Sequence, residues 1–145
     1  MKQGELYTAD ELLKKALRYK GYWGSKGGIT VSGGEPLLQM DFLTEFFKKA
    51  KAEGVHTNLD TSGNPFTDQE PWHSGWLELM KYTDLVMLDI KQIDEQEHIK
   101  LTGHSNKNIL AMARELSDMK KPVWIRHVLV PGGSDKDEYL SLIHI

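Results

Sequence analysis

Short apolar segments, several of them rich in β-branched residues, alternate along this chain with longer amphipathic segments. The apolar segments predict buried strands, and the amphipathic segments predict helices that cover them. The predicted strands are residues 29–31, 55–61, 85–91 and 122–130; the predicted helices are 9–20, 41–53, 72–82 and 109–119, with a further helix beginning at 135–142.

Strand–helix units that recur roughly every 30 residues are typical of parallel βαβ structure. Nearly continuous apolar strands indicate burial on both faces of a sheet, and the crossovers should be right-handed. About four such units are present, too few to close an eight-stranded barrel. We therefore expect an α/β fold, a partial (β/α) barrel of parallel strands, in one domain that spans residues 1–145.

Several residues mark where the helices begin and end. Thr8 and Glu11 have the spacing of a capping box at the start of the first helix. Pro36 is suited to open a helical segment, Asp41 is the predicted N-cap of the second helix, and Gly54 is its predicted stop.

The amino-acid composition excludes several classes of function. The 145 residues contain 39% hydrophobic residues and carry a net charge of −3, which indicates a soluble protein without a footprint for nucleic acid. No apolar run is long enough to span a membrane and the N-terminus has no signal-peptide core, so we expect a cytoplasmic protein. Cysteine is absent, which excludes disulfides, thiolate nucleophiles and an iron–sulfur cluster held by thiolates of this chain.

The first predicted strand ends in Gly33 and Gly34, followed by Glu35. Glycines at the carboxyl end of a strand let the main chain approach a ligand closely, and their carbonyls can accept hydrogen bonds from an amine. The alternative is an ordinary turn.

Polar residues also follow the other strands, and the carboxyl ends of parallel strands are where ligands bind in such folds. Asp60, Thr61, Asp89 and the Met87 carbonyl would form a cluster of hard oxygen ligands for a small cation. The alternative is that each aspartate caps a helix or a turn.

Two basic residues are candidates for the same site. Lys91 should point to the same side as Asp89, where it would bind an anionic group or, if desolvated, act as a Schiff-base amine; otherwise it is a solvated lysine. Arg126 shares a face with Trp124 and Val128, which suggests a carboxylate or ligand partner. The six histidines lack metal-ligand spacing, and the four tryptophans are interpreted as packing residues.

Four segments, in order and spacing, closely resemble the radical S-adenosylmethionine family that activates glycyl radical enzymes. The segments are SGGEP at 32–36, LDTSG at 59–63, DLVMLDIKQ at 84–92 and VWIRHVLVPG at 123–132. The resemblance implies a partial (β/α)6 barrel. It also implies two sets of site residues: Gly33, Gly34, Glu35, Asp89, Ile90 and Lys91, with Arg126 nearby, for S-adenosylmethionine, and Asp60, Thr61, Met87 and Asp89 for a monovalent cation.

The same resemblance implies a reaction and partners. In this family a [4Fe-4S] cluster reductively cleaves S-adenosylmethionine, and the resulting 5′-deoxyadenosyl radical abstracts hydrogen from a glycine of a partner such as pyruvate formate-lyase. Flavodoxin or ferredoxin would supply the electron. The family's CxxxCxxC loop should precede Tyr7, and residues 141–145 depart from the family pattern, so we expect an internal fragment that is inactive alone. A Schiff-base lyase that uses Lys91 and an inert ligand-binding fragment are the alternatives.

Overall fold

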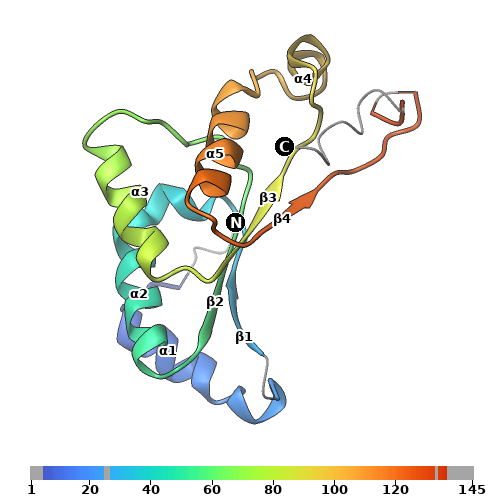
Figure 1. Ribbon diagram of the computed structural model, residues 1–145. Coiled ribbons are helices and arrows are strands. Elements are labelled where there is room, and N and C mark those ends of the chain that lie inside the picture. Colours follow the sequence, from blue (N-terminus) through green and yellow to red (C-terminus); the bar gives the residue numbers. More distant parts are fainter. Residues whose placement is uncertain (1–4, 25–26, 133, 137–145) are drawn as a thin grey trace.

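The computed structural model describes residues 5–24, 27–132 and 134–136, and at its centre is a parallel four-stranded sheet (Figure 1). The strands lie in the order β1-β2-β3-β4, and every neighbouring pair is parallel. Their bounds are β1 Gly28–Val31, β2 His56–Thr61, β3 Leu85–Asp89 and β4 Val123–Arg126. The predicted α/β fold with parallel strands is therefore confirmed.

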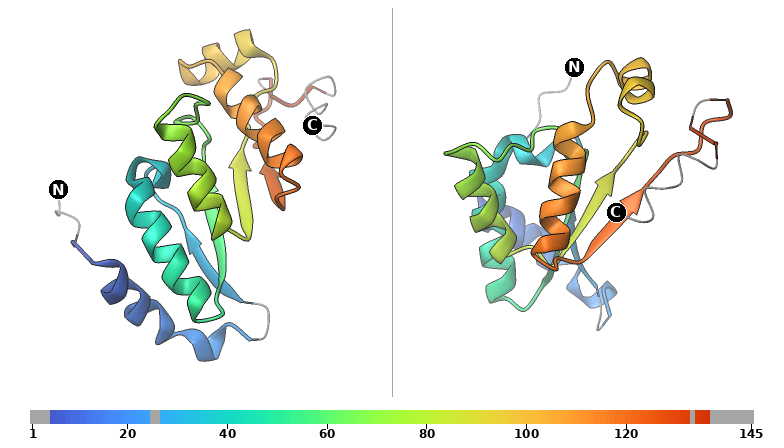
Figure 2. Two further views of the ribbon diagram at one scale, coloured as in Figure 1. Left: turned by 60° about the vertical axis from the view of Figure 1, so that its left-hand side comes forward. Right: turned by 45° about the horizontal axis from the view of Figure 1, so that its top comes forward.

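Helices cover one face of this sheet. Their bounds are α1 Ala9–Leu17, α2 Met40–Ala52, α3 Trp72–Lys81, α4 Glu95–Thr102 and α5 Lys107–Asp118, with 3-10 turns at Lys20–Tyr22 and Pro36–Gln39. Figures 1 and 2 show α1, α2, α3 and α5 on the same side of the strands, whereas α4 lies beyond the end of β3. The opposite face of the sheet carries no helix among the described residues.

The core lies between the sheet and its helices. Successive strand residues point to opposite faces, so alternate positions of β2 and β3 enter the core. The largest fully buried apolar side chains are Leu43, Phe46, Phe47, Leu59, Trp76, Leu79, Val86, Leu88, Ile90, Met112 and Leu116. Phe66, Trp72 and Trp76 pack against one another through their rings, as predicted for Trp72 and Trp76.

The helix ends follow local side-chain chemistry. The capping box of α1 is present, with Thr8 accepting from Glu11 N and Glu11 accepting from Thr8 N. The predicted N-cap Asp41 was wrong, because the 3-10 turn that Pro36 opens leads directly into α2 and leaves Asp41 inside its first turn. Gly54 ends this helix with a φ of 68°, as predicted.

The α4 helix was not predicted. Only His98 of this helix is buried, and Ile99 and Leu101 are exposed. Because the helix buries no apolar stripe, the sequence has no helical periodicity that would predict it. Its ends are nevertheless well marked: the Asp94 carboxylate accepts from Glu97 N at 2.9 Å, and Gly103 follows with a φ of 80°.

The fourth strand is shorter than predicted. β4 ends at Arg126, because β3 ends at Asp89 and offers no further ladder partner, so residues 127–130 run away from the sheet (Figure 1). The helix predicted at 135–142 lies largely outside the described residues. None of the helices in the described part of the chain has the length and apolar character needed to cross a membrane.

Candidate functional site

The carboxyl ends of the four strands bring most of the predicted site residues to one edge of the sheet. We call this the strand-end edge; it comprises Gly33, Gly34, Glu35, Asp60, Thr61, Asp89, Lys91 and Arg126. In parallel α/β folds this edge is where ligands bind.

Gly33 and Gly34 form an exposed turn directly after β1. Their φ angles are 89° and 58°, values in the left-handed region that favours glycine. Among the described residues, no heavy atom other than those of the chain neighbours lies within 4 Å of the position that a Cβ atom would take at either glycine. The main chain is therefore open at this turn, and the approach of a ligand to it stays a prediction.

The Glu35 side chain points back into the protein. One carboxylate oxygen accepts from Thr61 Oγ1 at 2.6 Å and from Leu37 N at 3.2 Å. The other accepts from Ser62 N at 3.0 Å and from Ser62 Oγ at 2.5 Å. Glu35 thus fastens the glycine turn after β1 to the end of β2, a positioning role that sequence reasoning missed.

Arg126 joins the ends of three strands. Its Nε donates to Asp89 Oδ1 at 2.8 Å, its Nη1 donates to Asp60 Oδ2 at 3.0 Å, and its Nη2 contacts Asp60 Oδ1. The predicted carboxylate partner of Arg126 is therefore confirmed, and there are two of them. Burial lowers the pKa of Arg126, but the hydrogen bond and charge of Asp89, together with Asp60, outweigh it and raise the pKa.

Asp89 is held by a second cation as well. Lys91 Nζ donates to Asp89 Oδ2 at 2.9 Å, so the two side chains share one side of the strand end, as predicted. Burial raises the pKa of Asp89, but the hydrogen bonds from Lys91 and Arg126 outweigh it and keep the pKa below its ordinary value. Lys91 therefore forms an ion pair with Asp89, and its use as a Schiff-base amine stays a prediction.

The predicted cation ligands are only partly brought together. The Asp60 and Asp89 carboxylates converge, but on the Arg126 guanidinium, while the Thr61 hydroxyl points the other way and donates to Glu35. Within the described ranges no three His, Cys, Asp or Glu side chains are grouped so as to hold a metal ion. An alkali cation bound by Asp60, Thr61, Met87 and Asp89 stays a prediction.

Ile90 contributes through its main chain. Its side chain is fully buried, its N donates to Arg126 O at 3.0 Å, and its O lies 2.7 Å from His127 Nδ1. A role for Ile90 in ligand binding stays a prediction. The second lone pair of its carbonyl oxygen would accept the hydrogen bond from the ligand.

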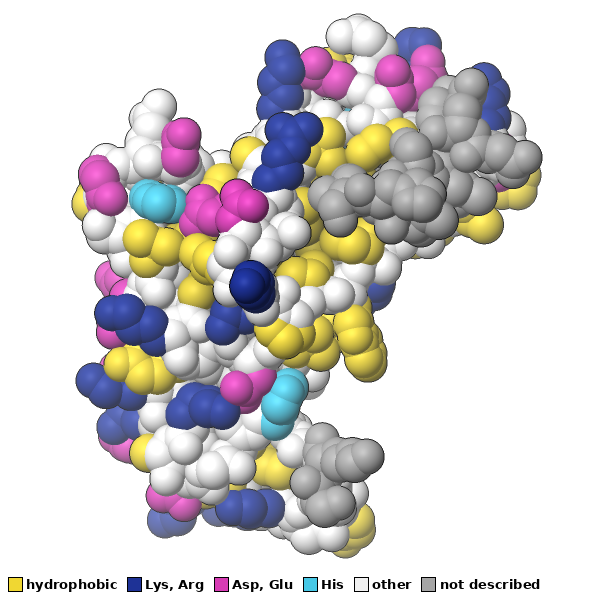
Figure 3. All heavy atoms as spheres, in the orientation of Figure 1, with side chains coloured by type: hydrophobic (Ala, Val, Ile, Leu, Met, Phe, Trp, Pro, Cys, Tyr) yellow, Lys and Arg dark blue, Asp and Glu magenta, His cyan; other side chains and the backbone are white. Residues whose placement is uncertain are grey.

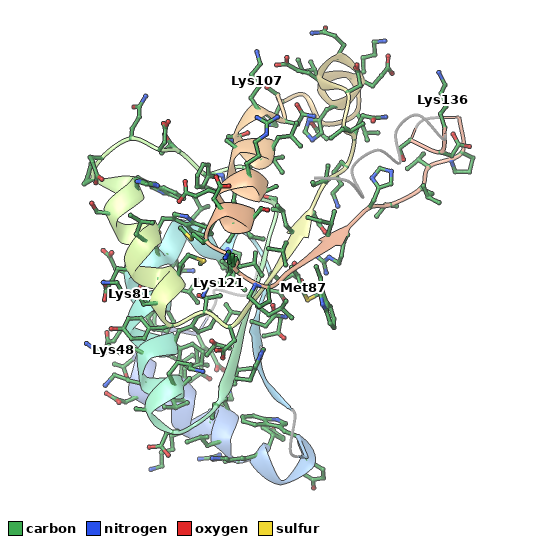
Figure 4. The ribbon with its side chains drawn as sticks, in the orientation of Figure 1. Lys48, Lys81, Met87, Lys107, Lys121 and Lys136 are labelled. Carbon is green, nitrogen blue, oxygen red and sulfur yellow. The ribbon has the colours of Figure 1, made fainter. Side chains whose placement is uncertain are left out.

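Trp124 departs from the prediction that the tryptophans serve packing. It is 64% exposed on the helix-free face of the sheet, where its register partner is Met87. Figure 4 shows Met87 projecting from β3 away from the helices, and Figure 3 shows hydrophobic side chains gathered on this side of the molecule. The alternation of β4 places Trp124 on the same face as Arg126, so it cannot reach the core.

The residues present fit S-adenosylmethionine better than they fit an iron–sulfur cluster. The open glycine turn offers main-chain acceptors, and Asp89 and Lys91 offer opposite charges for a zwitterionic ligand. A [4Fe-4S] cluster needs thiolate ligands, and the 145 residues contain no cysteine.

The parallel strands with helices on one face and charged residues at the strand ends define a domain of the parallel α/β-barrel class. The chain belongs to the Radical SAM superfamily, whose family model matches residues 1–143.

Several curated relatives share this sequence closely. The pyruvate formate-lyase-activating enzyme of Streptococcus mutans is 57% identical over 133 residues, which are 92% of this chain and 51% of the relative. The enzyme of the same name from Staphylococcus epidermidis is 58% identical over 134 residues, which are 92% of this chain and 53% of the relative. The chain thus spans about half the length of the curated relatives it matches.

A solved structure has the same fold. It is the crystal structure of a domain of pyruvate-formate lyase-activating enzyme from Bacteroides vulgatus, with a TM-score of 0.68 and 28% sequence identity. The match covers 81% of this chain and 69% of that chain.

Proposed function

We propose that this chain forms the S-adenosylmethionine-binding part of an enzyme that activates pyruvate formate-lyase or a related glycyl radical enzyme. The observation that carries the proposal is the open Gly33–Gly34 turn on the same strand-end edge as Asp89 and Lys91. This edge occurs in a chain that is 57% identical to a pyruvate formate-lyase-activating enzyme. Residues 1–145 are proposed to lie within one radical SAM domain.

Each site residue has a distinct task in the proposed function. The carbonyls of the Gly33–Gly34–Glu35 segment accept hydrogen bonds from the amino group of S-adenosylmethionine. The Lys91 ammonium attracts its carboxylate, and Asp89, whose lowered pKa keeps it ionised, orients Lys91. Arg126 fixes Asp89 relative to β2, so that the charged groups are positioned before the ligand arrives.

The proposed reaction also needs groups that this chain does not supply. Radical generation from S-adenosylmethionine requires the [4Fe-4S] cluster and an electron donor such as flavodoxin or ferredoxin. Because these 145 residues contain no thiolate for a cluster, we propose that the chain alone is inactive and contributes ligand and substrate binding.

A chimera tests the proposal. The 133 matched residues of the Streptococcus mutans enzyme are replaced by those of this chain, and the chimera is reconstituted anaerobically with iron, sulfide and a reductant. With S-adenosylmethionine and pyruvate formate-lyase, we expect the EPR signal of a glycyl radical. A chimera that folds and holds its cluster but yields no glycyl radical would overturn the proposed function.

A further inference from the structure

A pocket of about 230 Å³ lies beside the strand-end edge, between the loop after β2, the end of β3 and helix α4. The surface exposed in this pocket is mostly carbon, although most of the lining residues are polar or charged; the lining residues are Ser62, Asn64, Asp89, Lys91, His98, Thr102, His104 and Ile109. We call it the His98 pocket. A mostly apolar pocket with a few convergent polar groups is the usual form of a small-ligand site.

His98 presents an unused hydrogen-bond acceptor. Its side chain is buried, with 2% of the residue exposed, and its Nδ1 lies 2.7 Å from His104 O. Because a carbonyl oxygen only accepts, this contact assigns the proton of the neutral ring to Nδ1 and leaves a lone pair on Nε2. Nε2 has no partner within the described protein.

The Thr102 hydroxyl supports the same tautomer. Thr102 Oγ1 lies 2.8 Å from His98 O, to which it donates, and 3.1 Å from His98 Nδ1. With its own proton directed to a carbonyl, this hydroxyl can only accept from Nδ1–H. Both neighbours of Nδ1 therefore leave Nε2 as the acceptor, and an unpaired buried acceptor is unfavourable.

We propose that the His98 pocket binds a flat aromatic ring that carries one hydrogen-bond donor, which is directed at His98 Nε2. The volume suits a substituted ring, since a cavity of about 150 Å³ holds benzene. The Ile109 side chain offers apolar surface to the ring. In the proposed complex the N–H or O–H group of the ring donates to His98 Nε2, which is buried and has no partner among the described residues.

Two sources would provide such a ring: the nucleobase of S-adenosylmethionine, or an aromatic side chain of the polypeptide substrate. The pocket shares Asp89 and Lys91 with the strand-end edge. Either ring would therefore reach the pocket only if that edge binds S-adenosylmethionine. The question of the source rests on the proposed function, whereas ring binding itself does not.

Phenol and toluene are matched probes, because they share a shape and differ in the donor. The chain is labelled with ¹⁵N-histidine, and each probe is titrated while the His98 Nε2 resonance is followed by NMR. We expect phenol to bind roughly three- to tenfold more tightly than toluene, the effect of one net hydrogen bond, and to shift Nε2. Equal affinity of the two probes, or an Nε2 signal that phenol leaves unchanged because a bound water satisfies it, would overturn the proposal.

His98→Asn is the discriminating variant, because the asparagine amide can still donate to His104 O in place of Nδ1–H while the Nε2 acceptor is lost. We expect the preference for phenol to disappear. His104→Asn makes the same chemical change at an exposed pocket residue and should retain the preference. If His98→Asn fails to fold, the wild-type comparison of phenol with toluene still decides the matter.

A last titration of phenol is made with S-adenosylmethionine at saturation. Competition assigns the pocket to the nucleobase, whereas simultaneous binding assigns it to the substrate polypeptide; both results support a ring-binding pocket. Absence of S-adenosylmethionine binding would count against the proposed function and leave the phenol result intact.

Discussion

Arg126 Nη1 on β4 lies 3.0 Å from Asp60 Oδ2 on β2, so one side chain reaches across the intervening strand β3. On the way its Nε donates to Asp89. The guanidinium therefore holds together the ends of three strands that lie far apart in the sequence.

Removing the Arg126 guanidinium should leave the Asp60 and Asp89 carboxylates close together without a cation between them. We expect Arg126→Gln to lower the free energy of unfolding by about 1 kcal/mol. The loss is small because the Arg126–Asp60 ion pair is partly exposed and solvent screens it. Urea unfolding measures the change. The loss should shrink in an Asp60→Asn background, since both substitutions act on one network. Arg114→Gln, at an exposed residue of α5, is the control and should have little effect.

Glu35→Gln should loosen the glycine turn. Both carboxylate oxygens accept hydrogen bonds, so an amide must turn an N–H group toward a donor such as Leu37 N or Ser62 N. We expect a loss of about 1–2 kcal/mol in the free energy of unfolding. Urea unfolding beside Glu53→Gln, a change at an exposed glutamate, provides the comparison. Equal stability of the two variants would show that the Glu35 contacts do not anchor the turn.

The sequence predicts the parallel sheet well, because the strands are short and mostly apolar, as at 85–89, and amphipathic helices alternate with them. It also predicts that Asp60, Asp89 and Lys91 lie at one edge of the sheet, because parallel strands end at one edge. The pairing of Arg126 with Asp60 depends on strand order, which local patterns do not specify.

Helix α4 and the His98 pocket could not be predicted from local sequence patterns either. Helix α4 buries only His98, so periodicity gives no signal for it. The pocket around His98 exists only because the segment from 95 to 104 folds against the end of β3.

Asp84 should make the fold sensitive to acid. Burial raises its pKa, but hydrogen bonds from Lys51 and from Thr57 N outweigh burial and lower the pKa below the ordinary value of 3.8. The unfolded carboxyl therefore binds protons at higher pH than the folded one. The stabilisation is present above the ordinary value and is lost as the pH falls through the lower folded value.

Urea unfolding at a series of pH values checks this. Asp84→Asn should reduce stability at neutral pH and weaken the fall of stability on acidification, with the part due to Asp89 remaining. Asp118→Asn, at an exposed residue, should leave the pH profile unchanged. A wild-type profile in Asp84→Asn would contradict the assignment.

The predicted alkali cation should compete with Arg126 for Asp60 and Asp89. Thermal unfolding in sodium, potassium and tetramethylammonium chloride at equal ionic strength separates specific binding from screening. We expect the small cations to stabilise the protein, and to do so more strongly in Arg126→Gln, where the guanidinium is gone. Asp60→Asn should abolish the difference among the salts. Identical melting in all three salts, in wild type and in Arg126→Gln, would show that these residues bind no cation.

Binding of S-adenosylmethionine at the strand-end edge, against the glycine turn, can be measured by ligand-observed NMR titration of three proteins. Gly34→Ala and Gly54→Ala carry a similar backbone strain, since both glycines have positive φ and open space at the Cβ position, but Gly54 lies at the opposite ends of the strands. We predict that wild type and Gly54→Ala bind S-adenosylmethionine alike, weakly without a cluster. Gly34→Ala should bind at least roughly tenfold more weakly, a difference of about 1.4 kcal/mol. Equal affinity of the two variants, or no binding by wild type, would show that the glycine turn does not bind S-adenosylmethionine.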